Sequence, residues 1–146
     1  MSDFRLLDER FSASPQISEA DVAEARSRGF AMIVNNRPEH ESDDQTSGAE
    51  IEAAARSAGL DYRAIPITHS GFSEAQLDAL VEAMETAKGP VLAYCRSGTR
   101  STLLWALAQA RQGAAPETIA TQARAAGYDV TPVAPLIDML HARRNS

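Results

Sequence analysis

Cys95, the only cysteine in the chain, lies in a sequence context that suits covalent chemistry. The segment Leu92-Ala93-Tyr94-Cys95-Arg96-Ser97-Gly98-Thr99-Arg100-Ser101 joins an apolar run to a helix-like run. An apolar strand ending at Tyr94 would bring the sulfur to the carboxyl edge of a sheet, where open α/β folds bind ligands. The N-terminus of the following helix would favour an anion and, with nearby cations, a thiolate. The pattern predicts a thiolate nucleophile in an anion-binding loop.

The residues after Cys95 have predicted tasks in this loop. Gly98 allows the chain to curl so that backbone N–H groups of residues 96 to 101 point at one anion. Arg100 supplies a planar guanidinium for an oxyanion, and Ser101 is expected both to cap the helix and to donate its hydroxyl to the thiolate. The substrate-binding residues predicted here are Arg96, Ser97, Gly98 and Thr99. The alternative is a buried structural cysteine, for which the charged neighbours have no packing purpose.

A second group of polar residues, 35–47, follows the apolar run of residues 30–34. Arg37 is expected to reach the mouth of the same site and bind an anionic substrate, or else to form a surface ion pair with Glu39 or Glu41. The carboxylates of this loop are candidates for acid catalysis or for a hard metal ion, or they simply form a solvated loop; they are Glu39, Glu41, Asp43 and Asp44. His40 beside them is too little for a metal site, so no metal or other cofactor is expected.

Composition limits the class of protein. The chain has 146 residues, 44% of them hydrophobic, which is enough for one domain with a core. A net charge of -6 argues against a general nucleic-acid or anionic-membrane binder, so an anionic substrate must be held by the local field of the loop. One cysteine excludes an intramolecular disulfide, and an exposed thiolate suits the cytoplasm. The sequence contains no apolar run of membrane-spanning length.

Short apolar runs alternate with amphipathic stretches, which predicts an α/β sheet. Strands are expected at 4–7, 30–34, 62–67 and 90–94, with 11–15 as a turn-rich connection. Pro66 indicates an edge strand or the end of one. Helices are expected at about 18–29, 49–58, 74–86, from 101 onward, 116–126 and 134–142. We expect one domain, residues 1–146, with a central, mostly parallel sheet of four or five strands and about six helices.

Several segments resemble the phosphatase-like domain of the beta-lactamase-hydrolase-like family. They are residues 11–17, 33–38, 50–55, 62–67 and 95–101, and the resemblance extends to about Tyr128. It implies the fold of the cysteine-dependent tyrosine and dual-specificity phosphatases, a central sheet wrapped by helices. The family name does not imply lactam chemistry.

Two departures from true phosphatases bear on the reaction. Cysteine phosphatases have five residues between cysteine and arginine, whereas four separate Cys95 from Arg100, as in the similar loop of rhodaneses. The general-acid aspartate of dual-specificity phosphatases has no counterpart in residues 68–72, where His69 is either a substitute proton donor or a surface residue.

A tighter ring with one fewer N–H favours sulfur transfer through a Cys95 persulfide, from thiosulfate or a small persulfide. Hydrolysis of phosphate monoesters through a cysteinyl-phosphate is the alternative. A non-catalytic anion-sensing module is a third possibility. Each of these functions implies a small anionic partner and leaves the oligomeric state open.

Overall fold

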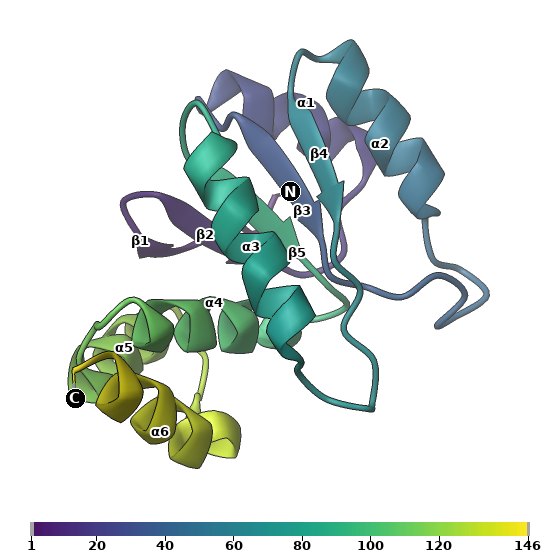
Figure 1. Ribbon diagram of the computed structural model, residues 1–146. Coiled ribbons are helices and arrows are strands. Elements are labelled where there is room, and N and C mark those ends of the chain that lie inside the picture. The colour runs from purple at the N-terminus through teal and green to yellow at the C-terminus, as the bar shows by residue number, and fades with distance from the viewer. Residues whose placement is uncertain (1, 146) are drawn as a thin grey trace.

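The structure, a computed structural model, describes residues 2–145. Its five strands form one sheet in the order β1-β2-β5-β3-β4 (Figure 1). They are β1 (Arg5–Asp8), β2 (Phe11–Ser14), β3 (Met32–Asn35), β4 (Asp61–Ala64) and β5 (Val91–Tyr94). The β1–β2 pair is antiparallel and the other pairs are parallel. This confirms the predicted mostly parallel sheet and the edge position of the strand before Pro66.

Within residues 2–145 there are six α-helices, as expected. They are α1 (Glu19–Ser27), α2 (Gly48–Ser57), α3 (Glu74–Thr86), α4 (Thr99–Arg111), α5 (Pro116–Ala125) and α6 (Ala134–Arg144), with a 3-10 turn at Thr131–Val133. Capping boxes begin α1 and α3, because Ser18 pairs with Asp21 and Ser73 with Gln76. No helix in the described part is long and apolar enough to cross a membrane.

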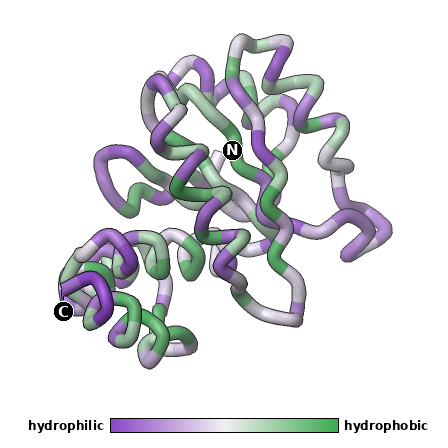
Figure 2. Tube along the Cα trace, in the orientation of Figure 1, coloured by the Kyte–Doolittle hydropathy of each residue, from purple (hydrophilic) through white to green (hydrophobic). Residues whose placement is uncertain are grey.

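The two faces of the sheet are covered by different helices (Figure 1). Consecutive strand residues point to opposite faces. In β5, Val91 and Ala93 join the core formed with α3, α4, α5 and α6, while Leu92 and Tyr94 join the core formed with α1 and α2. Figure 2 shows the hydrophilic segment between β3 and α2 projecting away from these layers. The sheet is therefore covered on both faces, as a parallel sheet requires.

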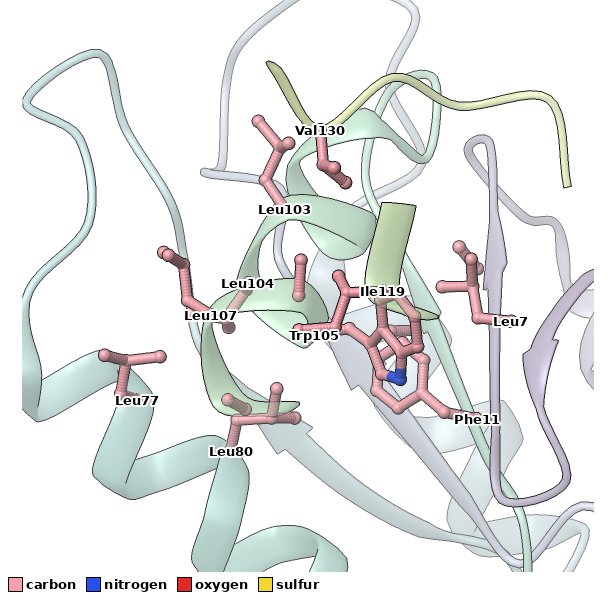
Figure 3. Packing of buried hydrophobic residues seen from close by; sticks show 14 of the residues in the cluster. Leu7, Phe11, Leu77, Leu80, Leu103, Leu104, Trp105, Leu107, Ile119 and Val130 are labelled. Carbon is pink, nitrogen blue, oxygen red and sulfur yellow. The ribbon is translucent and has the colours of Figure 1, made fainter. Parts of the chain in front are cut away.

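Helix α4 is the central helix of the larger core. Its Trp105 is fully buried and stacks on Phe11 of β2, with ring centroids 6.5 Å apart (Figure 3). The indole N–H donates to the Asp8 carboxylate at 2.9 Å. These contacts decide the orientation of Trp105. They also fix α4 against the sheet, and with it the residues at the N-terminus of the helix.

The segment 11–15 is not the turn-rich connection that the sequence predicted. Residues Phe11–Ser14 form β2, which is buried along its whole length and pairs in parallel with β5. Serine and the following Pro15 are poor strand signals. Here Ala13 belongs to the core beneath α4, which packs on this strand, while the buried Ser12 and Ser14 point to the opposite face, so tertiary packing overrides propensity.

The register of the parallel strands places their carboxyl ends side by side. Tyr94 pairs with Ser14 on one side and with Asn35 on the other, and Asn35 pairs with Ala64. The loops that follow these four strands therefore leave the sheet at one edge. Cys95 begins the central one of these loops, which is the placement that the sequence predicted.

Candidate active site

Cys95 follows β5 directly and lies beneath its own loop. Its backbone N–H donates to the Ser14 carbonyl at 3.3 Å, and its sulfur accepts a hydrogen bond from the Gly98 N–H at 3.1 Å. The residue is 0% exposed, so the exposed thiolate expected from the sequence is wrong for this structure. Gly98, whose N–H contacts the sulfur, adopts the left-handed conformation with φ 93°.

The start of α4 differs from the prediction at Ser101. The residue preceding the helix is Gly98, which offers no side-chain cap, and Ser101 is the third residue inside the helix. Its fully buried hydroxyl donates to Asn36 Oδ1 at 2.7 Å. A serine hydroxyl has one proton to donate, so in this conformation it does not donate to Cys95. Ser101 instead ties α4 to the end of β3.

Arg100 lies in the first turn of α4, and a carboxylate of the same chain occupies its guanidinium. Its Nη1 and Nη2 atoms donate to Glu41 Oε2 at 2.6 Å and Oε1 at 2.9 Å, and Nη1 also donates to the Ile67 carbonyl at 3.0 Å. The bond from Arg100, opposed by burial and assisted by Arg37, lowers the pKa of Glu41 from 4.5 to about 2. Glu41 is therefore an ionised partner of Arg100 at neutral pH.

Cys95 is the next influence on this arginine. The pKa of Arg100 is raised first by the hydrogen bond to Glu41, against the effect of burial, and then by its proximity to Cys95. Arg100 is thus a neighbour of both Glu41 and Cys95. This is the position from which it can hold an oxyanion that approaches the nucleophile.

Arg37 is buried and does not line the pocket beside Arg100. It is 5% exposed, and it donates to Glu41 at 2.9 Å, to the Gln16 side chain at 2.9 Å and to the Ser42 hydroxyl at 3.1 Å. The ion pair with Glu41 that the sequence offered as the alternative is present, but it is buried and does not lie on the surface. The buried Arg37 instead holds Glu41 in place, from the loop after β3.

A pocket of about 500 Å³ opens beside Arg100. Six residues line it: Pro38, Glu41, Thr68, His69, Arg96 and Arg100. The structure thus brings His69 and Arg96 to the same opening as Arg100, although the loops that carry them are far apart in the sequence. His69 is exposed. Ser97 and Thr99 hydrogen bond to each other through their hydroxyls at 3.0 Å, and the Thr99 N–H donates to the Ser97 hydroxyl.

Two other carboxylates of the loop after β3, those of Glu39 and Asp44, have separate partners. Glu39 accepts the Gly48 N–H at the start of α2, at 3.0 and 3.1 Å, and Asp44 accepts the Ser42 hydroxyl at 2.7 Å. Glu41 alone among the four predicted carboxylates lines the pocket with Arg100. Within residues 2–145 no cluster of three or more His, Cys, Asp or Glu side chains is placed to hold a metal ion.

A family model and several relatives match this chain. Residues 3–112 match the phosphatase-like domain of the Beta-lactamase hydrolase-like protein. The chain belongs to this family. Beta-lactamase hydrolase-like proteins of Agrobacterium fabrum (strain C58) and Xylella fastidiosa (strain Temecula1) are each 36% identical over 107 residues. The alignment covers 73% of this chain and 25% of each relative, so the chain matches about a quarter of their length.

Solved structures agree with the fold of this phosphatase-like domain. A phosphatase candidate from Neisseria meningitidis z2491 has a TM-score of 0.85 and 30% identity, covering 96% of this chain and 99% of its own. One from Shewanella putrefaciens CN-32 has a TM-score of 0.77 and 20% identity, covering 99% and 94%. A variant of P. aeruginosa TpbA, in complex with pTyr, has a TM-score of 0.67 and 16% identity, covering 99% and 91%. The last two similarities concern the fold alone.

Among the residues of the site that were not singled out from the sequence are Gln16, Asn36 and Tyr128. Gln16 binds Arg37, and its N–H donates to the Arg96 carbonyl at 3.2 Å. Asn36 accepts the Ser101 hydroxyl, and the Tyr128 hydroxyl donates to the Ser97 carbonyl at 3.1 Å. Position after a strand was an available signal for Gln16 and Asn36. No local signal existed for Tyr128.

Proposed function

We propose that this phosphatase-like domain hydrolyses small phosphate monoesters through Cys95. The observation that carries the proposal is the hydrogen bond from the Gly98 N–H to the Cys95 sulfur, in the same loop and helix start from which Arg100 lines an open pocket. The family and the similar phosphatase structures favour this reaction over sulfur transfer, which was the first expectation from the sequence.

In the proposed reaction, substrate binding begins with an exchange at Arg100. The guanidinium fork that Glu41 occupies matches the geometry of phosphoryl oxygens equally well. A bound phosphate group therefore displaces Glu41 from Arg100, and Arg37 retains the released carboxylate nearby. In the first turn of α4, the Thr99 N–H donates to the Ser97 hydroxyl. The N–H groups of Arg100 and Ser101 have no intrahelical carbonyl to bind and are available to the same phosphate.

The chemistry then proceeds in two displacements. The Cys95 thiolate attacks phosphorus and the ester P–O bond breaks, which leaves a cysteinyl-phosphate and an alkoxide or phenoxide that takes a proton. Water next attacks phosphorus, the S–P bond breaks, and phosphate and the thiolate are released. His69 is the proton donor that we assign to the first step, because it lines the pocket and Glu41 is ionised.

The loop length is the one observation that favours sulfur transfer instead. Four residues between Cys95 and Arg100 give a smaller ring of N–H groups than five would. In that reaction the Cys95 thiolate attacks the outer sulfur of thiosulfate, the S–S bond breaks and sulfite leaves. Cyanide then removes the outer sulfur of the Cys95 persulfide as thiocyanate and restores the thiolate.

One pair of assays decides between these reactions. The protein and its Cys95→Ser variant are each incubated with an aryl phosphate and, separately, with thiosulfate plus cyanide. Release of the aryl alcohol by the native protein, lost in the variant, is the expected result. Thiocyanate without ester hydrolysis would replace the proposal with sulfur transfer. Absence of both products, with phosphate still bound, would indicate an anion sensor.

A further inference from the structure

Tyr128 contacts the nucleophile loop from the segment between α5 and the 3-10 turn. The residue is 8% exposed and lies outside the residues, 3–112, that match the family model. Its hydroxyl donates to the carbonyl oxygen of Ser97 at 3.1 Å. It also fills the space above Gly98, where an added Cβ atom would lie 2.0 Å from the tyrosine oxygen.

The bond to Ser97 is connected to the sulfur through one peptide group. The Ser97 carbonyl and the Gly98 N–H belong to the same peptide unit, and that N–H donates to the Cys95 sulfur at 3.1 Å. Donation to a peptide oxygen polarises the unit and strengthens its N–H as a donor. We infer that Tyr128 is a positioning residue for the nucleophile, which stabilises the Cys95 thiolate through the peptide between residues 97 and 98.

The neighbouring guanidinium of Arg5 suits Tyr128 to this role. The guanidinium of Arg5 lies over its ring, 5.1 Å from the centroid, and also reaches the Ala126 carbonyl at 3.5 Å. The pKa of Tyr128 is raised above its ordinary value, chiefly by burial, so the hydroxyl keeps its proton at neutral pH. The Arg5 charge acts on this pKa in the opposite direction and so favours donation by the hydroxyl.

The groups that act on Cys95 come from four parts of the chain. Arg100 of α4 acts directly, Glu41 of the loop after β3 acts through Arg100, and Tyr128 acts from the loop after α5. Arg5 of β1 acts through the tyrosine ring. Removal of the Tyr128 hydroxyl leaves the Arg100–Glu41 pair intact, so its effect on the sulfur can be separated from theirs.

The test measures the rate of Cys95 alkylation by iodoacetamide as a function of pH. Cys95 is the only cysteine, so the rate belongs to it alone. Tyr128→Phe keeps the ring and its contact with Arg5 but removes the donor. Loss of the Tyr128 donor weakens the charge-assisted hydrogen bond from the Gly98 N–H to the Cys95 sulfur by about 10–30%, which predicts about twofold to threefold slower alkylation at pH values below the midpoint of the profile. The midpoint of the alkylation profile should also move to higher pH. Arg5→Met should give a smaller shift in the same direction.

Tyr62→Phe is the matched control. The Tyr62 hydroxyl accepts a hydrogen bond from Asn35 at 3.1 Å, and its ring belongs to the core on the α1–α2 face. The Tyr62→Phe variant should be less stable than the native protein in urea unfolding, as we also expect for Tyr128→Phe, but its alkylation profile should match that of the native protein. An unchanged profile in Tyr128→Phe, or an equal shift in both variants, would overturn the inference.

The inference rests on the proposed use of Cys95 as a thiolate but not on the substrate. Alkylation needs no turnover of ester or thiosulfate. A shifted profile in Tyr128→Phe therefore supports the role of Tyr128 even where the native protein hydrolyses no phosphate ester. A native protein that hydrolyses no phosphate ester would contradict the proposed function, whereas an unchanged alkylation profile in Tyr128→Phe would contradict the role of Tyr128.

Discussion

Replacement of Glu41 by glutamine tests the ion pair that controls Arg100. Glutamine keeps the shape of the side chain and its ability to accept a hydrogen bond but removes the charge. Glu41 has a pKa lowered from 4.5 to about 2, and its side chain is 20% exposed. A carboxylate with a lowered pKa stabilises the folded protein above its unfolded pKa, and this contribution is lost as the pH falls toward the folded pKa.

The magnitude follows from the two pKa values. A shift from 4.5 to about 2 corresponds, at 1.36 kcal/mol per unit, to a contribution of about 3 kcal/mol at neutral pH. About 2 kcal/mol of this would disappear between pH 6 and pH 3 by the same relation. Solvent screening of a partly exposed pair reduces both figures, so we expect about 1–2 kcal/mol at neutral pH and a loss of about 1 kcal/mol on acidification.

The assay is urea unfolding of the native protein and of Glu41→Gln at pH 6 and pH 3. The other carboxylates with lowered pKa values are present in both proteins and cancel in the comparison; they are Asp21, Asp44, Asp61 and Asp129. The native protein should be the more stable at pH 6, and the difference should narrow at pH 3. A difference that is the same at both pH values would refute the assignment of an ionised Glu41 held by Arg100.

Other substitutions test the nucleophile and its loop. Cys95→Ser should lower the proposed hydrolysis by more than about a thousandfold with the unfolding midpoint little changed, and residual turnover near the native rate would remove Cys95 from the mechanism. Arg100→Lys should lower kcat/KM about a hundredfold, because an ammonium cannot make the two-pronged contact; near-native kinetics would leave it only a general electrostatic role. Gly98→Ala should cost more than about 2 kcal/mol in urea unfolding, since φ is 93° and the new methyl meets Tyr128. A glycine inserted after Gly98 widens the ring, so the ratio of ester hydrolysis to sulfur transfer should rise, and an unchanged ratio would show that ring size does not select the reaction.

The parts of the fold that depend on local signals were predictable. Ser18 and Ser73 begin helices where their capping boxes indicate, and Pro116 is the first residue of α5. The placement of Cys95 between a buried strand and a helix also follows from the pattern of apolar residues. Strand β2 was missed because its small residues are favoured by α4 above them and by β5 beside them, neither of which is local.

The partners within the site were less predictable than their positions. The sequence places both Arg100 and Arg37 near the carboxyl edge of the sheet, but only the structure shows that Glu41 bridges them. Glu41 was one of four equivalent carboxylates, and 59 positions separate it from Arg100. Tyr128 and Ser97 are 31 positions apart. Such contacts depend on how α4 and α5 pack, which periodicity alone does not specify.

The net charge of the protein and the Glu41–Arg100 pair together determine which anions the pocket favours. A chain with a net charge of -6 repels anions at long range, so a ligand must gain its affinity within the pocket. In the proposed exchange, the ligand releases one carboxylate from Arg100 and replaces its hydrogen bonds. A monoanionic carboxylate gains little from this, because it replaces a group of its own kind. A phosphate monoester or thiosulfate brings a second charge, which Arg96 at the pocket and the N-terminus of α4 are placed to attract. The exchange therefore favours small dianions over carboxylates, whichever of the two reactions Cys95 performs.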